Sequence, residues 1–423
     1  MTMEVYIYLA VGLMCLLTCV QGAWALWGGV RFHRYVAAML AGAKDLRTAA
    51  GVFKYQPKVA VILPCCGVDE KLEHTISALA AQNYADYEVI FTFESKDDSA
   101  YAAINAWTRP WTRPPQRRVV AGLADCRGQK IHNLLAAVEQ VSPDREVFVF
   151  LDSDAVPGPD WLGHLVAPLG DQTVGAATGY RWYGATGGLA SGLRCAWNAA
   201  TVTLLDDERL NFCWGGATAI RRETFEVLGV ARRWSRALSD DYQMTRAVRD
   251  GGLRIRFVPQ ALVSSLDRTT LRAFWQFARR QVLITRVCAP AIWRAGLLLT
   301  SNFVAGSTAA AALFISAALG WFGSRAAMWA ALAVGVLILL LAAGKSTLRQ
   351  LALRKVLRPP DLTWRDFLWD VLGTIAISGT LHLGLFAASL SSRRVVWRNT
   401  EYELVSADET RVLGRKPASS ESA

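Results

Sequence analysis

Three groups of closely spaced aspartates in the middle of this 423-residue chain each stand beside a segment whose pattern predicts a regular element. They are Asp97-Asp98, Asp152-Ser153-Asp154 and Asp240-Asp241. The first two groups follow apolar runs typical of buried strands, and the third stands where a helical pattern begins. A carboxylate after a strand, then a D-x-D pair, then a late carboxylate suits an enzyme that holds a metal–nucleotide diphosphate and activates a hydroxyl.

The D-x-D pair is the candidate metal site. Asp152 and Asp154 are two residues apart, so in an extended backbone both side chains face the same side. Two carboxylates and the oxygens of a diphosphate would hold Mg²⁺ or Mn²⁺, which would neutralise the departing UDP. The alternative is an ordinary turn, because Asp-Ser-Asp is followed by Pro157-Gly158-Pro159.

The other two groups have separate candidate roles. Asp98 could bind the base or ribose of the nucleotide, with Asp97 as a solvated neighbour, although Asp-Asp-Ser is also a common helix cap. Asp241 is the candidate general base that takes the proton from an acceptor hydroxyl. Asp240 is expected to support or cap the helix. The alternative is that both aspartates cap the helix that begins near Tyr242.

A basic and aromatic segment, Trp275 to Gln281, precedes a long apolar run. Its helical spacing puts guanidinium and amide groups on a helix, and arginine binds diphosphate through paired hydrogen bonds. A basic flank of a membrane span is the competing interpretation. The candidate diphosphate ligands here are Gln276, Arg279, Arg280 and Gln281.

Strands and helices alternate between the apolar runs at the two ends of the chain. This alternation predicts an α/β domain with a mostly parallel, Rossmann-like sheet and helices on both faces. Ligands of such sheets bind at the carboxyl ends of the strands, where two of the acidic groups fall. The expected strands are 59–63, 87–93 and 147–151, and the expected helices are 72–81, 130–141, 193–205, 240–248 and 271–287.

Two further segments are expected to lack regular structure. Residues 107–118 are rich in Arg, Pro and Trp and are expected to form an exposed loop, and the polar tail from Ala407 onward is expected to be disordered.

The chain is expected to be an integral membrane protein. Its hydrophobic content is 52%, and Val5–Val30 contains no charged side chain over more than the ~20 residues that span a bilayer. Residues 295–324 and 326–344 are similarly uncharged. Glu4 precedes the first segment and Arg31 follows it, which favours an uncleaved anchor with a cytosolic catalytic region over a signal peptide.

A fourth apolar stretch, 367–392, carries Asp370 and His382. A fourth full span would leave Arg393 and Arg394 outside, against the positive-inside tendency, so three spans and a broken, re-entrant or interfacial segment are expected. The net charge is +11, and many of the basic residues lie beside the apolar segments. It indicates anionic lipid headgroups, not nucleic acid, as the partner. Eight cysteines without a C-x-x-C pattern give no zinc signature.

The expected organisation has five parts. They are a transmembrane anchor (1–30), a basic juxtamembrane linker (31–57), the catalytic domain (58–288), C-terminal membrane helices (289–392) and a C-terminal tail (393–423).

Taken together, several motifs resemble the ceramide glucosyltransferase family, glycosyltransferase family 21, as a bacterial-type member of the family-2-like GT-A enzymes. The resemblance runs over most of the chain. It rests on Gly67-Val68-Asp69, Tyr84 to Val89, Asp97 to Ala100, Lys130 to Leu134, Asp152-Ser153, Asp240-Asp241-Tyr242, the G-x-x-x-x-x-R-R stretch Gly215 to Arg222, and Trp397-Arg398 with Tyr402 and Leu404.

The resemblance implies a GT-A fold and an inverting transfer from a UDP-α-sugar to a lipid. It implies that Asp98, Asp152 and Asp241 are the nucleotide-binding and catalytic aspartates and that Lys130 contributes to donor binding. It places the stretch 215–222 in a loop near the acceptor. The family's (Q/R)-x-x-R-W motif is altered here, since Arg280 stands where Trp is usual, so either Arg279 or Arg280 would reach the diphosphate.

Three functions are consistent with the sequence. The first is transfer of glucose to ceramide or a similar lipid to give a β-glycolipid. The second is transfer of a hexosamine or uronic acid to a hopanoid, sterol or diacylglycerol. The third is a catalytically silent membrane scaffold that binds nucleotide-sugar. For the first two, a location in a bacterial inner membrane is expected, and the oligomeric state is open.

Overall fold

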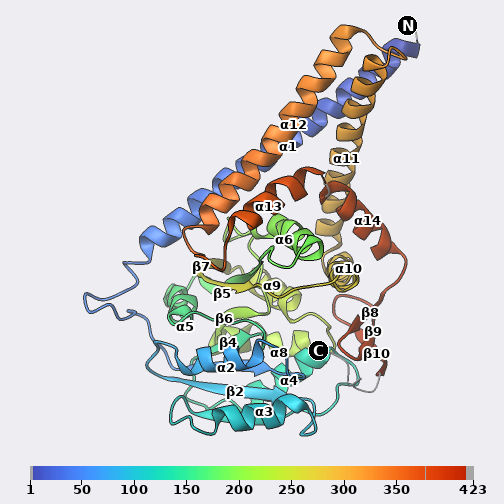
Figure 1. The fold of residues 1–423 in the computed structure, drawn as a ribbon. Helices are drawn as coiled ribbons and strands as arrows, with labels where there is room; N and C mark the ends of the chain where they lie inside the picture. Colours follow the sequence, from blue (N-terminus) through green and yellow to red (C-terminus); the bar gives the residue numbers. More distant parts are fainter. Residues whose placement is uncertain (1–2, 377, 416–423) are drawn as a thin grey trace.

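The computed structural model describes residues 3–376 and 378–415 of the chain. An α/β body carries a stalk of three long helices, and several shorter helices lie where the two meet (Figure 1).

The body is built on a seven-stranded sheet in the order β3-β2-β1-β4-β6-β5-β7. Strands β3, β2, β1 and β4 are parallel, as are β5 and β7, while β6 runs antiparallel to both β4 and β5. The sheet is therefore mostly parallel, as the sequence predicted. The strands are β1 (Val59–Pro64), β2 (Tyr87–Phe93), β3 (Gln116–Val120), β4 (Val147–Leu151), β5 (Val174–Tyr183), β6 (Ala217–Arg221) and β7 (Arg254–Ser265).

Helices cover both faces of this sheet because its central strands are apolar on both sides. Val61 of β1 packs in one buried cluster and Ile62 in the other. The first cluster receives α2 (Leu72–Ala80), α3 (Ser99–Thr108) and α5 (Trp161–Val166). The second receives α4 (Gln129–Glu139), α7 (Arg222–Val227), α8 (Val230–Trp234) and α9 (Asp240–Asp250).

The expectation of a loop over 107–118 is wrong at both ends. Helix α3 continues to Thr108, and β3 begins at Gln116. Strand β3 stands at the sheet edge and is only partly buried, so it needs no apolar run. A pattern search for buried strands therefore passes over it.

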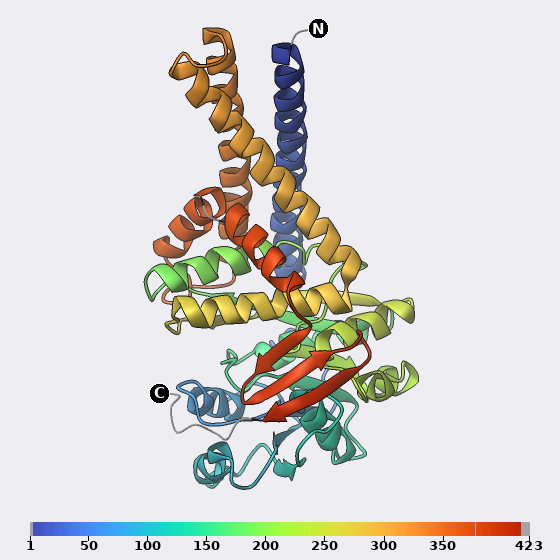
Figure 2. The same ribbon diagram turned by 90° about the vertical axis from the view of Figure 1, so that its right-hand side faces the viewer.

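Among the described residues, three helices are long and apolar enough to cross a membrane, as the sequence predicted. They are α1 (Met3–Gly42), α11 (Pro290–Ala318) and α12 (Arg325–Leu353), and they form the stalk (Figures 1 and 2). The fourth apolar stretch forms two helices of 13 residues, α13 (Trp364–Ala376) and α14 (Ser378–Leu390). Each is shorter than the ~20 residues that a span requires.

A buried ion pair fastens α13 to α12. The guanidinium of Arg349 binds the carboxylate of Asp370, and Gln350 donates a hydrogen bond to the same carboxylate at 2.7 Å. The side chains of Arg349 and Asp370 are almost completely buried. A charge at this depth is stable only while its partner is present.

We therefore expect Asp370→Asn to lower the stability of the protein by about 3–5 kcal/mol, because it leaves Arg349 buried without a counter-charge. The measurement is the thermal unfolding midpoint in detergent. Arg365→Gln, on an exposed position of the same helix, is the control. Apolar replacement of both partners, Arg349→Met with Asp370→Leu, should recover most of the loss.

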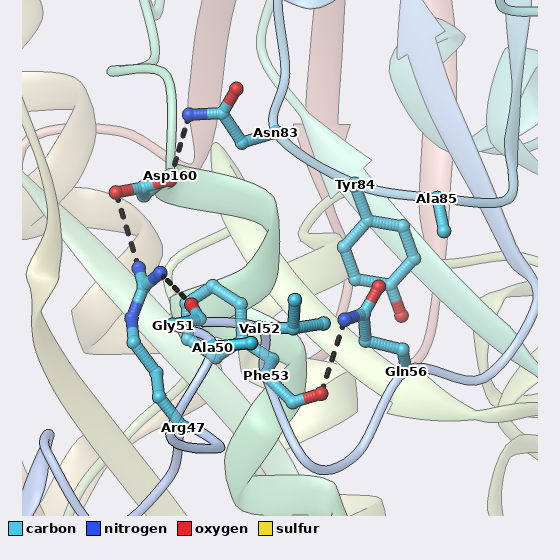
Figure 3. Close-up of a pocket in the computed structure, with 10 residues that line it drawn as sticks. All are labelled: Arg47, Ala50, Gly51, Val52, Phe53, Gln56, Asn83, Tyr84, Ala85 and Asp160. Atoms are coloured by element: carbon cyan, nitrogen blue, oxygen red, sulfur yellow. Dashed lines mark hydrogen bonds and ion pairs between the residues drawn. The ribbon is translucent and has the colours of Figure 1, made fainter.

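The chain after α1 is held against the body at a hollow of about 460 Å³ (Figure 3). Arg47 pairs with Asp160 at 3.1 Å and stacks on the Phe53 ring at 4.0 Å. Asn83 donates to the other oxygen of Asp160 at 2.9 Å. The hollow contains no residue of the three acidic groups, and its contacts anchor the linker to α5 and the loop before β2.

The chain beyond α14 forms a second, three-stranded antiparallel sheet. Its strands are β8 (Arg394–Trp397), β9 (Thr400–Leu404) and β10 (Thr410–Arg415). The expectation of disorder from Ala407 onward is thus wrong as far as Arg415, and residues 416–423 lie outside the described part. The sheet escaped sequence detection because few of its apolar side chains are buried: Val395, Tyr402 and Leu404 are its buried hydrophobic side chains.

Candidate active site

Lys130 joins two of the acidic groups at the carboxyl edge of the sheet. It lies in the first turn of α4, and its Nζ is 2.8 Å from Asp152 Oδ1, 3.1 Å from Asp240 Oδ2 and 3.0 Å from the Gly215 carbonyl. Burial opposes the charge on Lys130, but the two carboxylates outweigh it and raise its pKa. The resemblance placed Lys130 at the donor site, and the structure puts it beside the D-x-D motif.

Asp98 ties the end of β1 to the start of α3. Its Oδ1 accepts hydrogen bonds from the backbone N–H of Gly67 at 2.9 Å and of Ala100 at 2.8 Å. The carboxylate is therefore the N-cap of α3, the alternative that the sequence left open, and it also faces the loop after β1. Asp97 is exposed and bonds to Ser95.

Asp154 is bound by an arginine that the sequence did not indicate. Arg181, near the end of β5, places its two terminal nitrogens 2.6 and 2.5 Å from the two oxygens of Asp154 and 3.6 Å from Asp152. Burial alone would raise the pKa of Asp154, but Arg181 holds it well below its usual range. Sequence analysis missed Arg181 because β5 was not among the expected strands.

The two aspartates of the D-x-D motif converge, since both reach the same guanidinium. Their side chains are 27% and 38% exposed. Within the described residues, no three His, Cys, Asp or Glu side chains form a ready metal cluster. The pair fits a divalent cation that takes its remaining ligands from phosphate oxygens. Asp152 has the freer carboxylate, because both oxygens of Asp154 bind Arg181.

Asp240 and Asp241 have different surroundings. Asp240 is buried and faces Lys130. The side chain of Ser239, not that of Asp240, caps α9. Asp241 accepts a hydrogen bond from the Tyr242 N–H at 2.8 Å and one from the Ser239 hydroxyl. Burial, and then the charge of Asp240, raises the pKa of Asp241 to about 6.

This pKa suits a general base, because Asp241 is charged at neutral pH yet binds a proton more strongly than an ordinary carboxylate.

The two candidate arginines of α10 (Leu271–Cys288) point to different places. Arg279 donates to the Ala388 carbonyl at 3.3 Å and so ties α10 to the end of α14. Arg280 lies over the Phe277 ring at 5.6 Å, and its Nε is buried without a hydrogen-bond partner. Tyr183 lies close enough to act on the charge of Arg280.

Phe277 packs against Tyr183 at 5.8 Å, and the Arg181 guanidinium lies 5.8 Å from the Tyr183 ring. Arg280 is therefore the arginine on the side of α10 that faces the D-x-D motif. Gln276 is exposed and Gln281 half-buried. In the described part of the chain, neither contacts the acidic groups.

Gly215 and Gly216 leave room for the charged groups. A Cβ on Gly215 would lie 2.3 Å from Asp240 Oδ2, and one on Gly216 would lie 2.6 Å from Asp152 Oδ2 and 2.3 Å from the Trp214 ring. The rest of this stretch corrects an expectation, because residues 217–221 form β6 and not a loop. At its far end, Arg221 binds the carbonyls of Leu169 and Val174, away from the pocket.

We expect Gly216→Ala to lower kcat/KM about 100-fold, because the added methyl group displaces Asp152 and misplaced groups lose that much rate. Steady-state kinetics of the purified protein would measure the loss. Gly158→Ala is the control, since a Cβ there meets nothing within 4 Å. Unchanged kinetics in Gly216→Ala would contradict the close packing around Asp152.

Aromatic rings extend from the neighbourhood of the D-x-D motif to the base of the stalk. Tyr183 packs edge-on against Phe277 at 5.8 Å, and Phe277 against Trp197 at 5.5 Å. Trp197 lies on α6 (Leu189–Val202), which with α10 crosses beneath the stalk (Figure 2). The Arg194 guanidinium lies 4.5 Å from the Tyr183 ring and donates to Asp267 at 2.7 Å, and Asp267 also pairs with Lys71.

The sheet, with carboxylates at the ends of its parallel strands, defines a GT-A nucleotide-sugar glycosyltransferase attached to membrane-type helices. Comparisons with known proteins agree with that class. The model of glycosyl transferase family 21 matches residues 10–410. The chain belongs to this family, as the sequence motifs indicated.

Two solved structures are similar to this chain at low sequence identity. Mannosyltransferase PcManGT from Pyrobaculum calidifontis, solved with GDP-Man and Mn²⁺, is 21% identical and superposes with a TM-score of 0.51 over 87% of this chain and 99% of its own. Glucosyl-3-phosphoglycerate synthase from Mycobacterium tuberculosis, solved with Mn²⁺ and UDP, is 14% identical, with a TM-score of 0.34 over 54% of this chain and 78% of its own.

Proposed function

We propose that the protein transfers a sugar, glucose in the first instance, from a UDP-sugar to the hydroxyl of a membrane lipid such as ceramide, with inversion to a β-glycolipid. The observation that carries this proposal is the placement of Asp241. Its carboxylate, with a pKa raised to about 6, stands next to Asp240, which shares Lys130 with Asp152. The proposed base, Asp241, and the proposed donor-binding carboxylate, Asp152, are thus linked through Asp240 and Lys130.

In the proposed reaction the acceptor oxygen attacks the anomeric carbon as Asp241 takes its proton. The bond from that carbon to the diphosphate oxygen breaks, and UDP leaves with the electron pair. Arg280 would bind the negative charge that develops on the diphosphate. Asp98 would face the nucleotide from the start of α3, beside the loop after β1.

A divalent cation would be held by Asp152, with Asp154 beside it and the donor's phosphates completing the site. Bound there, Mg²⁺ or Mn²⁺ acts as a Lewis acid that stabilises the leaving diphosphate. Lys130 keeps Asp152 in place through the 2.8 Å contact. Arg181 does the same for Asp154.

The aromatic rings of β5, α6 and α10 favour the proposal that the acceptor is a lipid. They extend from the pocket to helices whose exposed side chains include Leu189, Leu271 and Trp275. Such helices lie along a bilayer surface with their apolar side chains in lipid. The basic flanks of α1 and α12 favour a catalytic body on the cytosolic side of the membrane. By analogy with bacterial-type relatives, this would be a bacterial inner membrane.

The proposal is tested with purified protein in nanodiscs containing ceramide, Mn²⁺, and UDP-glucose, UDP-galactose, UDP-GlcNAc or UDP-glucuronate in turn. Mass spectrometry of the extracted lipids should show a hexose added to ceramide from UDP-glucose. Parallel discs with diacylglycerol, a sterol or a hopanoid test other acceptors. A product only with another donor or lipid would replace the substrates proposed here. Nucleotide-sugar binding without any product would indicate a scaffold.

A further inference from the structure

The C-terminal sheet is fastened to the same elements that carry the active site. The backbone N–H of Gln129, next to Lys130, donates to the Tyr402 hydroxyl at 3.2 Å. Asp408 accepts hydrogen bonds from Gln243 at 2.9 Å and Arg246 at 2.8 Å, both on α9. Figure 2 shows the sheet directly below α10, in agreement with the shared apolar cluster of α10, β8 and β9. The sheet therefore has a fixed position beside the pocket.

The turn between β8 and β9 has an unusual backbone. Trp397 pairs with Thr400, which leaves Arg398 and Asn399 as a two-residue turn. Arg398 has φ of 53°, and among the described residues it is the one non-glycine residue with a positive φ. Turns of this length favour glycine or asparagine at such positions, because a Cβ strains the left-handed backbone. An arginine here suggests that its side chain has a use that offsets the strain.

The turn brings a second cation to Arg280. The Trp397 ring lies 5.2 Å from the Arg280 guanidinium. The next residue, Arg398, is close enough to lower the pKa of Arg280 in addition to the larger effect of burial. The charge of Arg398 also acts on Asp154, at the D-x-D motif, and on Cys66, after β1. Arg398 is exposed and directly follows the Trp397 ring that contacts Arg280.

Neither arginine has a carboxylate partner. Within the described residues, Arg398 and Arg280 form no ion pair within 4 Å, and Arg280 Nε has no hydrogen-bond partner. Two unpaired guanidinium groups that repel each other are stabilised by an anion between them, and guanidinium favours phosphate through paired hydrogen bonds.

We propose that Arg398, carried by the β8–β9 turn, binds the diphosphate of the nucleotide-sugar together with Arg280, so that the C-terminal sheet completes the donor site. This inference rests on the function proposed above, because the diphosphate is that of the proposed donor. It adds a residue from the far end of the chain to a site otherwise built from the catalytic body and α10.

The test separates binding of the phosphates from binding of the nucleobase and ribose. Binding of UDP, inorganic pyrophosphate and uridine, each with Mn²⁺, is measured by calorimetry on the purified full-length protein. The variant Arg398→Gly removes the guanidinium and relaxes the backbone at a positive φ, so the fold should be kept. We expect it to weaken UDP and pyrophosphate binding about tenfold or more, with uridine binding unchanged.

Two further variants control the measurement. Arg398→Lys keeps a charge without the paired donors and should lie between wild type and Arg398→Gly. Arg394→Ala removes an exposed arginine from the same hairpin, 4.0 Å from Glu401, and should bind all three probes as wild type does. In turnover, Arg398→Gly should raise the KM for the donor more than it lowers kcat, which a merely structural role would not produce.

Wild-type affinity for pyrophosphate in Arg398→Gly would overturn the inference. An equal loss of uridine binding would also overturn it, because the turn would then support the whole pocket and not the phosphates. If wild type binds pyrophosphate but neither UDP nor uridine, while Arg398→Gly still loses pyrophosphate, the donor proposed above is wrong and the role of Arg398 stands. Absence of pyrophosphate and nucleotide binding in wild type would overturn both.

Discussion

Asp241→Asn is expected to lower kcat by about 100- to 10,000-fold, the usual contribution of a general base, while UDP affinity stays close to that of wild type. The amide keeps an oxygen that can accept the hydrogen bond from the Tyr242 N–H, so α9 should remain in place. It cannot take a proton from the acceptor. Turnover and UDP binding on the same preparation measure the two effects separately.

The matched control is Asp97→Asn, an exposed aspartate that forms hydrogen bonds with Ser95. It should retain wild-type turnover. Asp241→Asn with wild-type turnover would remove Asp241 as the base, whereas a parallel loss of UDP binding would show that Asp241 holds the donor instead.

Asp152→Asn is expected to lower kcat/KM by about 1000-fold or more, because the proposed cation and the charge-stabilising network around it both depend on this carboxylate. The substitution also removes the charge that Lys130 meets at 2.8 Å. A titration of activity against Mn²⁺ should show a higher metal requirement than in wild type.

Asp154→Asn provides the comparison within the same motif. Both oxygens of Asp154 are taken by Arg181, so its loss should cost less activity than that of Asp152 and shift the Mn²⁺ requirement less. If the two variants lose activity equally, with equal shifts in the metal requirement, both carboxylates ligate the cation and the assignment to Asp152 alone is wrong.

The sequence was sufficient for the parts of the site that depend on local pattern. Strands β1, β2 and β4 are short apolar runs, and the acidic residues at the ends of β2 and β4 follow from them directly. The carboxyl ends of parallel strands lie at one edge of the sheet, so the placement of these residues at that edge could be predicted. The three spanning helices were equally visible, because a bilayer demands a long uncharged segment.

The remaining parts depend on contacts between distant segments. Arg279 and Arg280 are neighbours about 100° apart on one helix, and only packing against α14 and β8 decides which of them faces the pocket. Arg181 meets Asp154 across the sheet, from a strand that the sequence did not reveal. Arg398 reaches the site because the polar C-terminal segment folds back onto the body as a sheet. No local apolar pattern predicts this fold.

The pH dependence of kcat/KM tests the central claim most directly, because the proposed base must be unprotonated in the free enzyme to act. Burial and Asp240 raise the pKa of Asp241 to about 6, so kcat/KM should be constant above pH 7 and fall about tenfold per pH unit well below 6. The residual kcat/KM of Asp241→Asn should lack this limb. A wild-type kcat/KM that stays constant down to pH 5, or that has the same acid limb in Asp241→Asn, would contradict the account.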